Sequence, residues 1–329
     1  MKTAPPPWIA RLPAGLFAMP LGLLGLAGAW RRASQFGSAD ALAVAQALAG
    51  LALCLGLLLG ALYLLKWLRH PQAVRAELAH PVAGPLMAAM PLATLLAVAF
   101  YGQPDRFGWL ALAVGAMALQ ARITLPVVSG LVTGNPTAWA MTPALYMPPV
   151  GGGFIGALAF QALGFPSLAA LLYGMGLASW FLLEARVLNR LFEGPLPEPA
   201  RPTIGIELAP PALATLTAAT LWPSLPGAVL LVGLGLAAGP LVTVLARYRW
   251  WSKVPFGAGF WSFSFPVAAL ASGVIEATLR SHTPFWIAGT ALAMACGVFL
   301  FLTVRTLALL LRGRLIPPAP SGPAGPPAA

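Results

Sequence analysis

Long apolar stretches, each near the length needed to cross a lipid bilayer, constrain the fold of this chain more than any other feature. A transmembrane helix needs about 20 consecutive apolar residues, and most connections between the stretches are short. We therefore expect an all-α polytopic membrane protein with ten transmembrane helices paired as five hairpins. The expected helices cover residues 13–30, 41–65, 83–101, 107–126, 143–163, 167–190, 203–222, 226–246, 257–279 and 284–311.

The composition excludes several functional classes. Charged residues make up 8% of the 329 residues, whereas a soluble domain usually has about 25%. The formal charge of +11 does not indicate nucleic-acid binding, because the 19 basic residues lie in short clusters between the apolar stretches. Cys54 and Cys296 lack a CxxC pair or a nearby histidine, so we expect no metal site and no cofactor. The sequence has no phosphate-binding loop and no nucleophile elbow, and we expect no enzymatic activity.

The two ends of the chain differ in character. Residues 1–312 are predicted to form the transmembrane domain, and the Pro/Gly/Ala-rich residues 313–329 a disordered cytoplasmic tail. The first apolar stretch resembles a signal peptide, but later stretches repeat its pattern, so we expect it to be retained. Of the 19 Lys and Arg residues, 15 fall on one predicted side of the membrane. The positive-inside rule then predicts an inner-membrane protein with both termini in the cytoplasm.

Proline positions indicate an internal repeat of one hairpin. The odd-numbered stretches carry interior prolines, whereas the even-numbered ones carry only Pro240, near the end of the eighth. Proline removes a backbone hydrogen bond, and in lipid the freed groups must face protein or water. We expect five proline-kinked inner helices in a quasi-fivefold arrangement around a central pore, with five straight helices outside. The prolines concerned are Pro20, Pro91, Pro148, Pro149, Pro210, Pro211 and Pro266.

The residues that precede the first proline of each odd-numbered stretch are predicted to share one level of the pore. All are apolar, and the set is Met19, Met90, Met147, Ala209 and Phe265. Such residues on the axis would form a hydrophobic constriction that gates by dewetting or by a movable plug. The alternative for the methionines is ordinary gap filling between helices.

The charged residues within the apolar stretches lead to two predictions. Glu207 lies about one turn into the seventh stretch, where an acid is a candidate proton-coupling or selectivity site. The alternative, which we favour, places it near a helix N-terminus at the cytoplasmic interface, where the helix dipole stabilises an anion. Glu276 and Arg280 are spaced as a helical i,i+4 pair and are expected at the outer surface.

Five segments of the sequence resemble those of a known protein family. They are RLPAGLFAMPLGLLGLAGAW (11–30), AVRAELAHPV (73–82), PALYMPPVGGGF (143–154), SWFLLEARVLNRLFEGPLPEPARPTIGIELAPP (179–211) and GAGFWSFSFPVAALASG (257–273). Together they resemble the tellurite-resistance/dicarboxylate transporter family (TehA-like), which includes the plant guard-cell slow anion channels. The resemblance covers nearly all of the chain up to about residue 311.

The resemblance implies five inner helices around a pore, five outer helices and a homotrimer with one pore in each subunit. It also implies passive conduction of small anions through a pore closed by a phenylalanine of the ninth helix, which corresponds to Phe265. We therefore expect a channel for small monovalent anions in the lipid bilayer. The alternative is a proton-coupled exporter of dicarboxylate, sulfite or a tellurite-type oxyanion, with Glu207 as its proton site. Under either function, the partners of this protein are expected to be small inorganic anions or small carboxylates.

Overall fold

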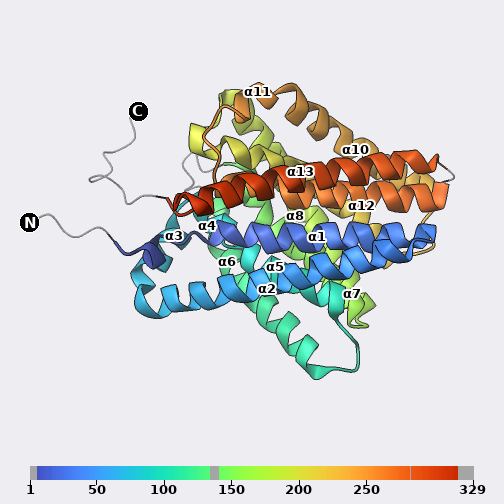
Figure 1. The fold of residues 1–329 in the computed structure, drawn as a ribbon, viewed down its shortest axis with the longest axis horizontal. Helices are drawn as coiled ribbons and strands as arrows, with labels where there is room; N and C mark the ends of the chain where they lie inside the picture. Colours follow the sequence, from blue (N-terminus) through green and yellow to red (C-terminus); the bar gives the residue numbers. More distant parts are fainter. Residues whose placement is uncertain (1–5, 134–140, 282, 318–329) are drawn as a thin grey trace, which may run out of the picture.

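Long helices that run roughly along a common direction make up the molecule (Figure 1). The computed structural model describes residues 6–133, 141–281 and 283–317, and this part of the chain contains helices and no strand. Nine of its helical segments are long and apolar enough to cross a membrane. The fold class is therefore an all-helical, multi-pass membrane protein, as predicted from the sequence.

Five long helices form the outer layer of the bundle. In each, only 17% to 22% of the most apolar window is buried, so these helices present most of their side chains outward. They are α2 (Ala39–Arg69), α6 (Phe107–Val132), α8 (Pro166–Glu193), α10 (Gly227–Ala246) and α13 (Phe285–Leu311). Helix α6 continues past its predicted end at residue 126, which leaves Pro126 inside it. The expectation that Pro240 is the one interior proline of an outer helix is therefore wrong.

Five shorter helices lie inside this layer. They are α1 (Ala18–Ala33), α5 (Ala89–Tyr101), α7 (Gly152–Ala162), α9 (Ala209–Leu221) and α12 (Ser264–Ser281). In the spans that contain α1, α5, α9 and α12, 61% to 78% of the apolar window is buried. Helix α1 packs against α5 and α12, α7 packs against α5 and α9, and α9 packs against α12. These helices are thus neighbours of one another and are mostly buried within the bundle.

The inner helices begin at the prolines that the repeat singles out. A 3-10 segment leads directly into three of them: η2 (Ala14–Phe17) into α1, η7 (Glu198–Leu208) into α9 and η8 (Ala258–Phe263) into α12. Helix α5 instead follows a short α-helix, α4 (Ala83–Leu86), and a turn at Met87 and Ala88. The prolines then fall on the second or third residue of the α-helix, where a missing N–H costs little because it has no intrahelical acceptor. The predicted kinks are therefore changes of helix type at an α-helix start.

The fifth apolar stretch is the most irregular. It divides into a 3-10 turn, η5 (Pro143–Tyr146), a π-helical turn, η6 (Met147–Gly151), and α7. Two adjacent prolines cannot donate to the backbone ladder, which accounts for the break. Buried Gln120 of α6 donates its amide N–H to the carbonyl oxygens of Met147 and Pro148, at 3.2 and 2.6 Å. This stretch is not among the nine long helices, and the count of ten stays a prediction.

The remaining elements lie at the ends of the bundle. The segments η1 (Trp8–Arg11) and η3 (Ser34–Phe36) flank α1, α3 (Pro71–Ala79) follows α2, and α11 (Tyr248–Trp251) follows α10. Helix α3, the start of the described chain and the end of α13 share one end of the molecule (Figure 1). Of the predicted tail, Leu315 and Ile316 pack against the core, and residues 318–329 lie outside the described residues.

Candidate functional site

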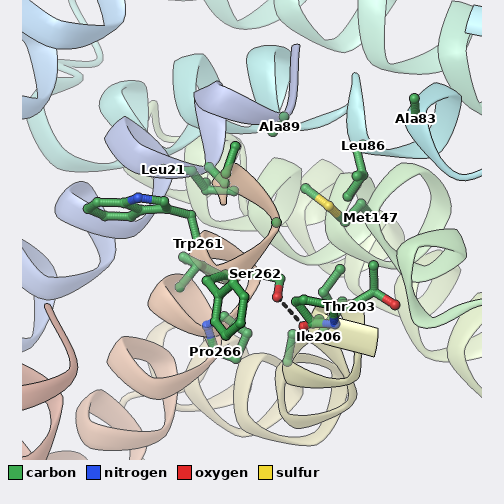
Figure 2. Close-up of a pocket in the computed structure, with 18 of the residues that line it drawn as sticks. Leu21, Ala83, Leu86, Ala89, Met147, Thr203, Ile206, Trp261, Ser262 and Pro266 are labelled. Carbon is green, nitrogen blue, oxygen red and sulfur yellow. Dashed lines mark hydrogen bonds between the residues drawn. The ribbon is translucent and has the colours of Figure 1, made fainter. Parts of the chain in front are cut away.

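An apolar cavity of about 510 Å³ lies among the inner helices. Every inner helix, or the segment that leads into it, contributes to its wall (Figure 2). Representative lining residues are Leu21, Leu92, Ile155, Leu213 and Phe265. Most of this wall is apolar and carries no Lys or Arg, so an anion against the apolar side chains would keep its hydration shell or lose it without compensation.

Phe265 lies at the start of α12, where the backbone is held by hydrogen bonds. The Ser264 hydroxyl donates to the carbonyl oxygen of Trp261 at 2.6 Å, and it reaches the Ala18 carbonyl oxygen at 3.3 Å. The Phe265 side chain is 8% exposed, and its ring packs against α1. A Cβ added to Gly25 would lie 3.0 Å from its Cδ2 atom. The ring is thus seated against a glycine while it borders the cavity.

The structure brings some of the predicted pore residues together and leaves others outside the cavity wall. Those that line the cavity are Met147, Ala209, Pro210, Phe265 and Pro266. Those that do not are Met19, Met90, Pro20, Pro91, Pro148, Pro149 and Pro211. In α1 and α5 the cavity is lined instead by Ala18, Leu21, Ala89 and Leu92.

The proline repeat therefore selects the helices that form the wall but not always the residues. Successive residues of an α-helix point about 100° apart, so a small difference in register turns a side chain away from the axis. Pro20 illustrates this, because its Cβ faces Gly56 of outer helix α2.

The charged groups on the cavity wall are acidic, and both have basic partners. Glu77 forms an ion pair with Lys66, whose ammonium also donates to the Leu12 carbonyl oxygen at 2.7 Å. Glu77 also accepts from the Ala14 backbone N–H at 2.7 Å and from the Tyr63 hydroxyl at 3.0 Å. It thereby ties α2 and α3 to the start of the α1 segment. Sequence reasoning missed this residue, although it lies in the segment AVRAELAHPV.

The second acid on the wall is Glu198, which begins η7. Its carboxylate lies 3.4 Å from Arg201, and its side chain is 71% exposed. A pair this exposed is screened by water and contributes little to stability.

Glu207 lies two residues before α9, as expected for a residue near a helix N-terminus, and it is buried in the protein. Its side chain is 6% exposed, and its Oε1 atom has no hydrogen-bond partner among the described residues. Its neighbours Ile206 and Ala209 line the cavity, whereas Glu207 does not. Glu207 is therefore shielded from solvent by the protein itself, and its placement at the cytoplasmic interface stays a prediction.

Glu207 interacts with two groups on other elements. They are the Tyr146 hydroxyl and the Glu184 carboxylate of α8. Glu184 is well satisfied, because the Tyr146 hydroxyl and the Trp180 indole N–H both donate to its Oε2 atom at 2.8 Å. Two carboxylates thus lie behind the cavity wall, next to Tyr146, which lines the cavity.

A second charged cluster joins the far ends of the inner helices. Glu276 is 8% exposed and lies 3.0 Å from the Arg32 Nε atom and 2.9 Å from the Arg280 Nη2 atom. Arg32 also donates to the Thr220 hydroxyl at 3.2 Å, which links α1, α9 and α12. The expected i,i+4 pair of Glu276 and Arg280 is confirmed, but Glu276 is buried and has a second partner in Arg32. The i,i+4 spacing reveals Arg280 but cannot reveal Arg32, which is distant in sequence.

The part of the chain that the structure describes contains no group of three His, Cys, Asp or Glu residues placed to hold a metal ion.

Comparison with known proteins connects this architecture to anion transport. The voltage-dependent anion channel (SLAC1) family matches residues 11–307, which is most of the chain. A tellurite resistance protein TehA homolog from Haemophilus influenzae is 27% identical over 79% of this chain and 80% of its own length. The S-type anion channel SLAH3 from Arabidopsis thaliana is 26% identical over 84% of this chain and 44% of its own length.

Proposed function

We propose that this chain, which belongs to the voltage-dependent anion channel family, conducts small monovalent anions passively through the cavity among its inner helices. The observation that carries the proposal is the apolar cavity to which all five inner segments contribute. Phe265 borders this cavity at the contact between α12 and α1, which is a suitable place for a gate. The proposed activity is transport, with no catalytic step.

In the proposed pore, selectivity arises from dehydration. The described cavity wall has no basic residue, so no ring of fixed cations attracts one anion over another. An anion must then lose part of its hydration shell against apolar side chains, and the cost is smaller for weakly hydrated anions. Nitrate and iodide are therefore expected to permeate more readily than chloride.

The proposal extends to the assembly and the membrane. The subunit is proposed to have ten spans in a quasi-fivefold arrangement, one pore, and two partner subunits in a homotrimer. The excess of Lys and Arg on one side supports an inner-membrane protein with both termini in the cytoplasm.

Purified protein in liposomes tests this function. A potassium gradient with valinomycin sets a membrane potential, and anion flux is followed without a pH gradient. We expect uncoupled flux in the order iodide and nitrate above chloride. Flux that requires a pH gradient would contradict the channel, and the reverse anion order would contradict the dehydration mechanism.

The carboxylates behind the wall support a second candidate, a proton-coupled exporter of dicarboxylate, sulfite or a tellurite-type oxyanion. The specific observation is Glu207, which is buried, unpartnered at Oε1 and close to Glu184 and Tyr146. A buried acid beside a second acid is the type of group that exchanges a proton during transport.

A further inference from the structure

A second cavity, of about 710 Å³, lies between outer helices instead of among the inner ones. Helices α2, α3 and α6 contribute to it, and so does the start of α5. We call this cavity the outer groove. Its wall is mostly apolar and includes Leu64, Leu68, Met87, Met90, Leu119 and Ile123. Leu64, Leu68 and Leu119 are exposed, so the groove opens toward the lipid side of the bundle.

Two arginines line the outer groove without a partner. Arg75 of α3 and Arg122 of α6 form no hydrogen bond or ion pair with any residue that the structure describes. The one acid of α3, Glu77, is occupied by Lys66, Tyr63 and a backbone N–H. Helix α6 has no acid at all. Two positive charges therefore face one apolar groove with no counter-charge.

The position of Arg122 makes this arrangement unusual. It lies ten residues before the end of α6, about 15 Å along the axis at 1.5 Å per residue. Arginines this far inside a membrane helix ordinarily face an ionic partner or a polar route to the interface. The positive-inside bias accounts for arginines at this end of the molecule. It does not account for two of them on the wall of one groove.

We propose that the outer groove binds an anionic phospholipid. Its phosphate lies between the Arg75 and Arg122 guanidinium groups, and an acyl chain lies along the apolar wall. The amphipathic indole of Trp67, which lines the groove on α2, suits the boundary between headgroup and chain. Charge favours a lipid over a second copy of the chain, because each copy has 8 acidic residues against 19 basic ones.

Native mass spectrometry of the purified protein with added phosphatidylglycerol or phosphatidylcholine tests this site. We expect the wild type to retain phosphatidylglycerol more tightly than phosphatidylcholine. Arg75→Gln and Arg122→Gln should each weaken phosphatidylglycerol binding about fivefold, in line with the contribution of a basic side chain near an anionic surface. Arg312→Gln is the control, because it removes an exposed charge at the end of α13 that does not line the groove.

A second variant tests the acyl-chain part of the site with both arginines present. A Cβ on Gly60 of α2 would meet nothing within 4 Å, so we expect the side chain of Gly60→Leu to extend into the groove. It should weaken lipid retention, whereas Gly50→Leu, on the same helix in similarly open space, should not. Equal retention of the two lipids, or binding unchanged in the groove variants, would overturn the proposal. A changed number of chains per particle in these variants would also overturn it, by showing that the groove is an interface between copies.

Discussion

At the scale of single residues, the buried polar groups of this protein serve the irregular backbone of the inner segments. Gln120 donates to the carbonyl oxygens of Met147 and Pro148 in the π-helical turn. The sequence shows the prolines and predicts a break, but it cannot show which distant side chain binds the carbonyl groups of this turn. Contacts of this kind between helices depend on packing, and they were therefore missing from the predictions.

Glu207→Gln distinguishes the two proposed functions at this scale. The substitution preserves shape and removes the exchangeable acid, so a passive channel should keep its anion flux and pH dependence nearly unchanged. A proton-coupled exporter should instead lose flux driven by a pH gradient while the protein stays folded. The measurement is liposome flux with and without a pH gradient. Glu193→Gln, an exposed acid at the end of α8, is the matched control.

At the scale of elements, prolines and glycines determine where the inner helices start and how closely they approach. The prolines were predicted to mark five inner helices, and the chain does change from 3-10, π or broken helix to α-helix at these positions. The side chains that face the cavity differ from the prediction in two helices, because Met19 and Met90 do not line the cavity whereas Ala18 and Ala89 do. Register depends on the axial rotation of each helix, which packing sets and a proline pattern does not encode.

Close packing of α1 against α12 leads to a stability prediction. A Cβ on Gly22 would lie 2.2 Å from the Ser264 Oγ atom, so Gly22→Ala forces the two helices apart next to Phe265. We expect a loss of about 1–3 kcal/mol from overpacking, measured as a lower melting temperature in detergent. Gly50→Ala in α2 is the control, since its Cβ would meet nothing within 4 Å. It should be neutral or stabilising by about 0.5–1 kcal/mol through helix propensity. Equal effects at both glycines would contradict the close contact.

At the scale of the whole molecule, the length and hydrophobicity of the apolar stretches predict the membrane fold. The proline pattern predicts the separation of inner from outer helices, because freed backbone groups are costly in lipid. The buried cluster of Glu276, Arg32 and Arg280 was not predicted as a unit, because Arg32 and Glu276 are 244 positions apart. The outer groove was also not predicted, because it requires knowledge of how α2, α3 and α6 converge.

Phe265→Ala tests most directly the central claim that anions pass through the inner cavity and that Phe265 closes it. Phe154→Ala is the matched control, because Phe154 is a fully buried phenylalanine of α7 that does not line the cavity. Each substitution removes a buried ring, and we expect each to cost about 3–5 kcal/mol of stability. Anion flux into liposomes and melting temperature in detergent are measured for both variants. The account predicts raised flux with retained anion preference for Phe265→Ala alone, whereas unchanged or reduced flux with a lowered melting temperature would contradict it.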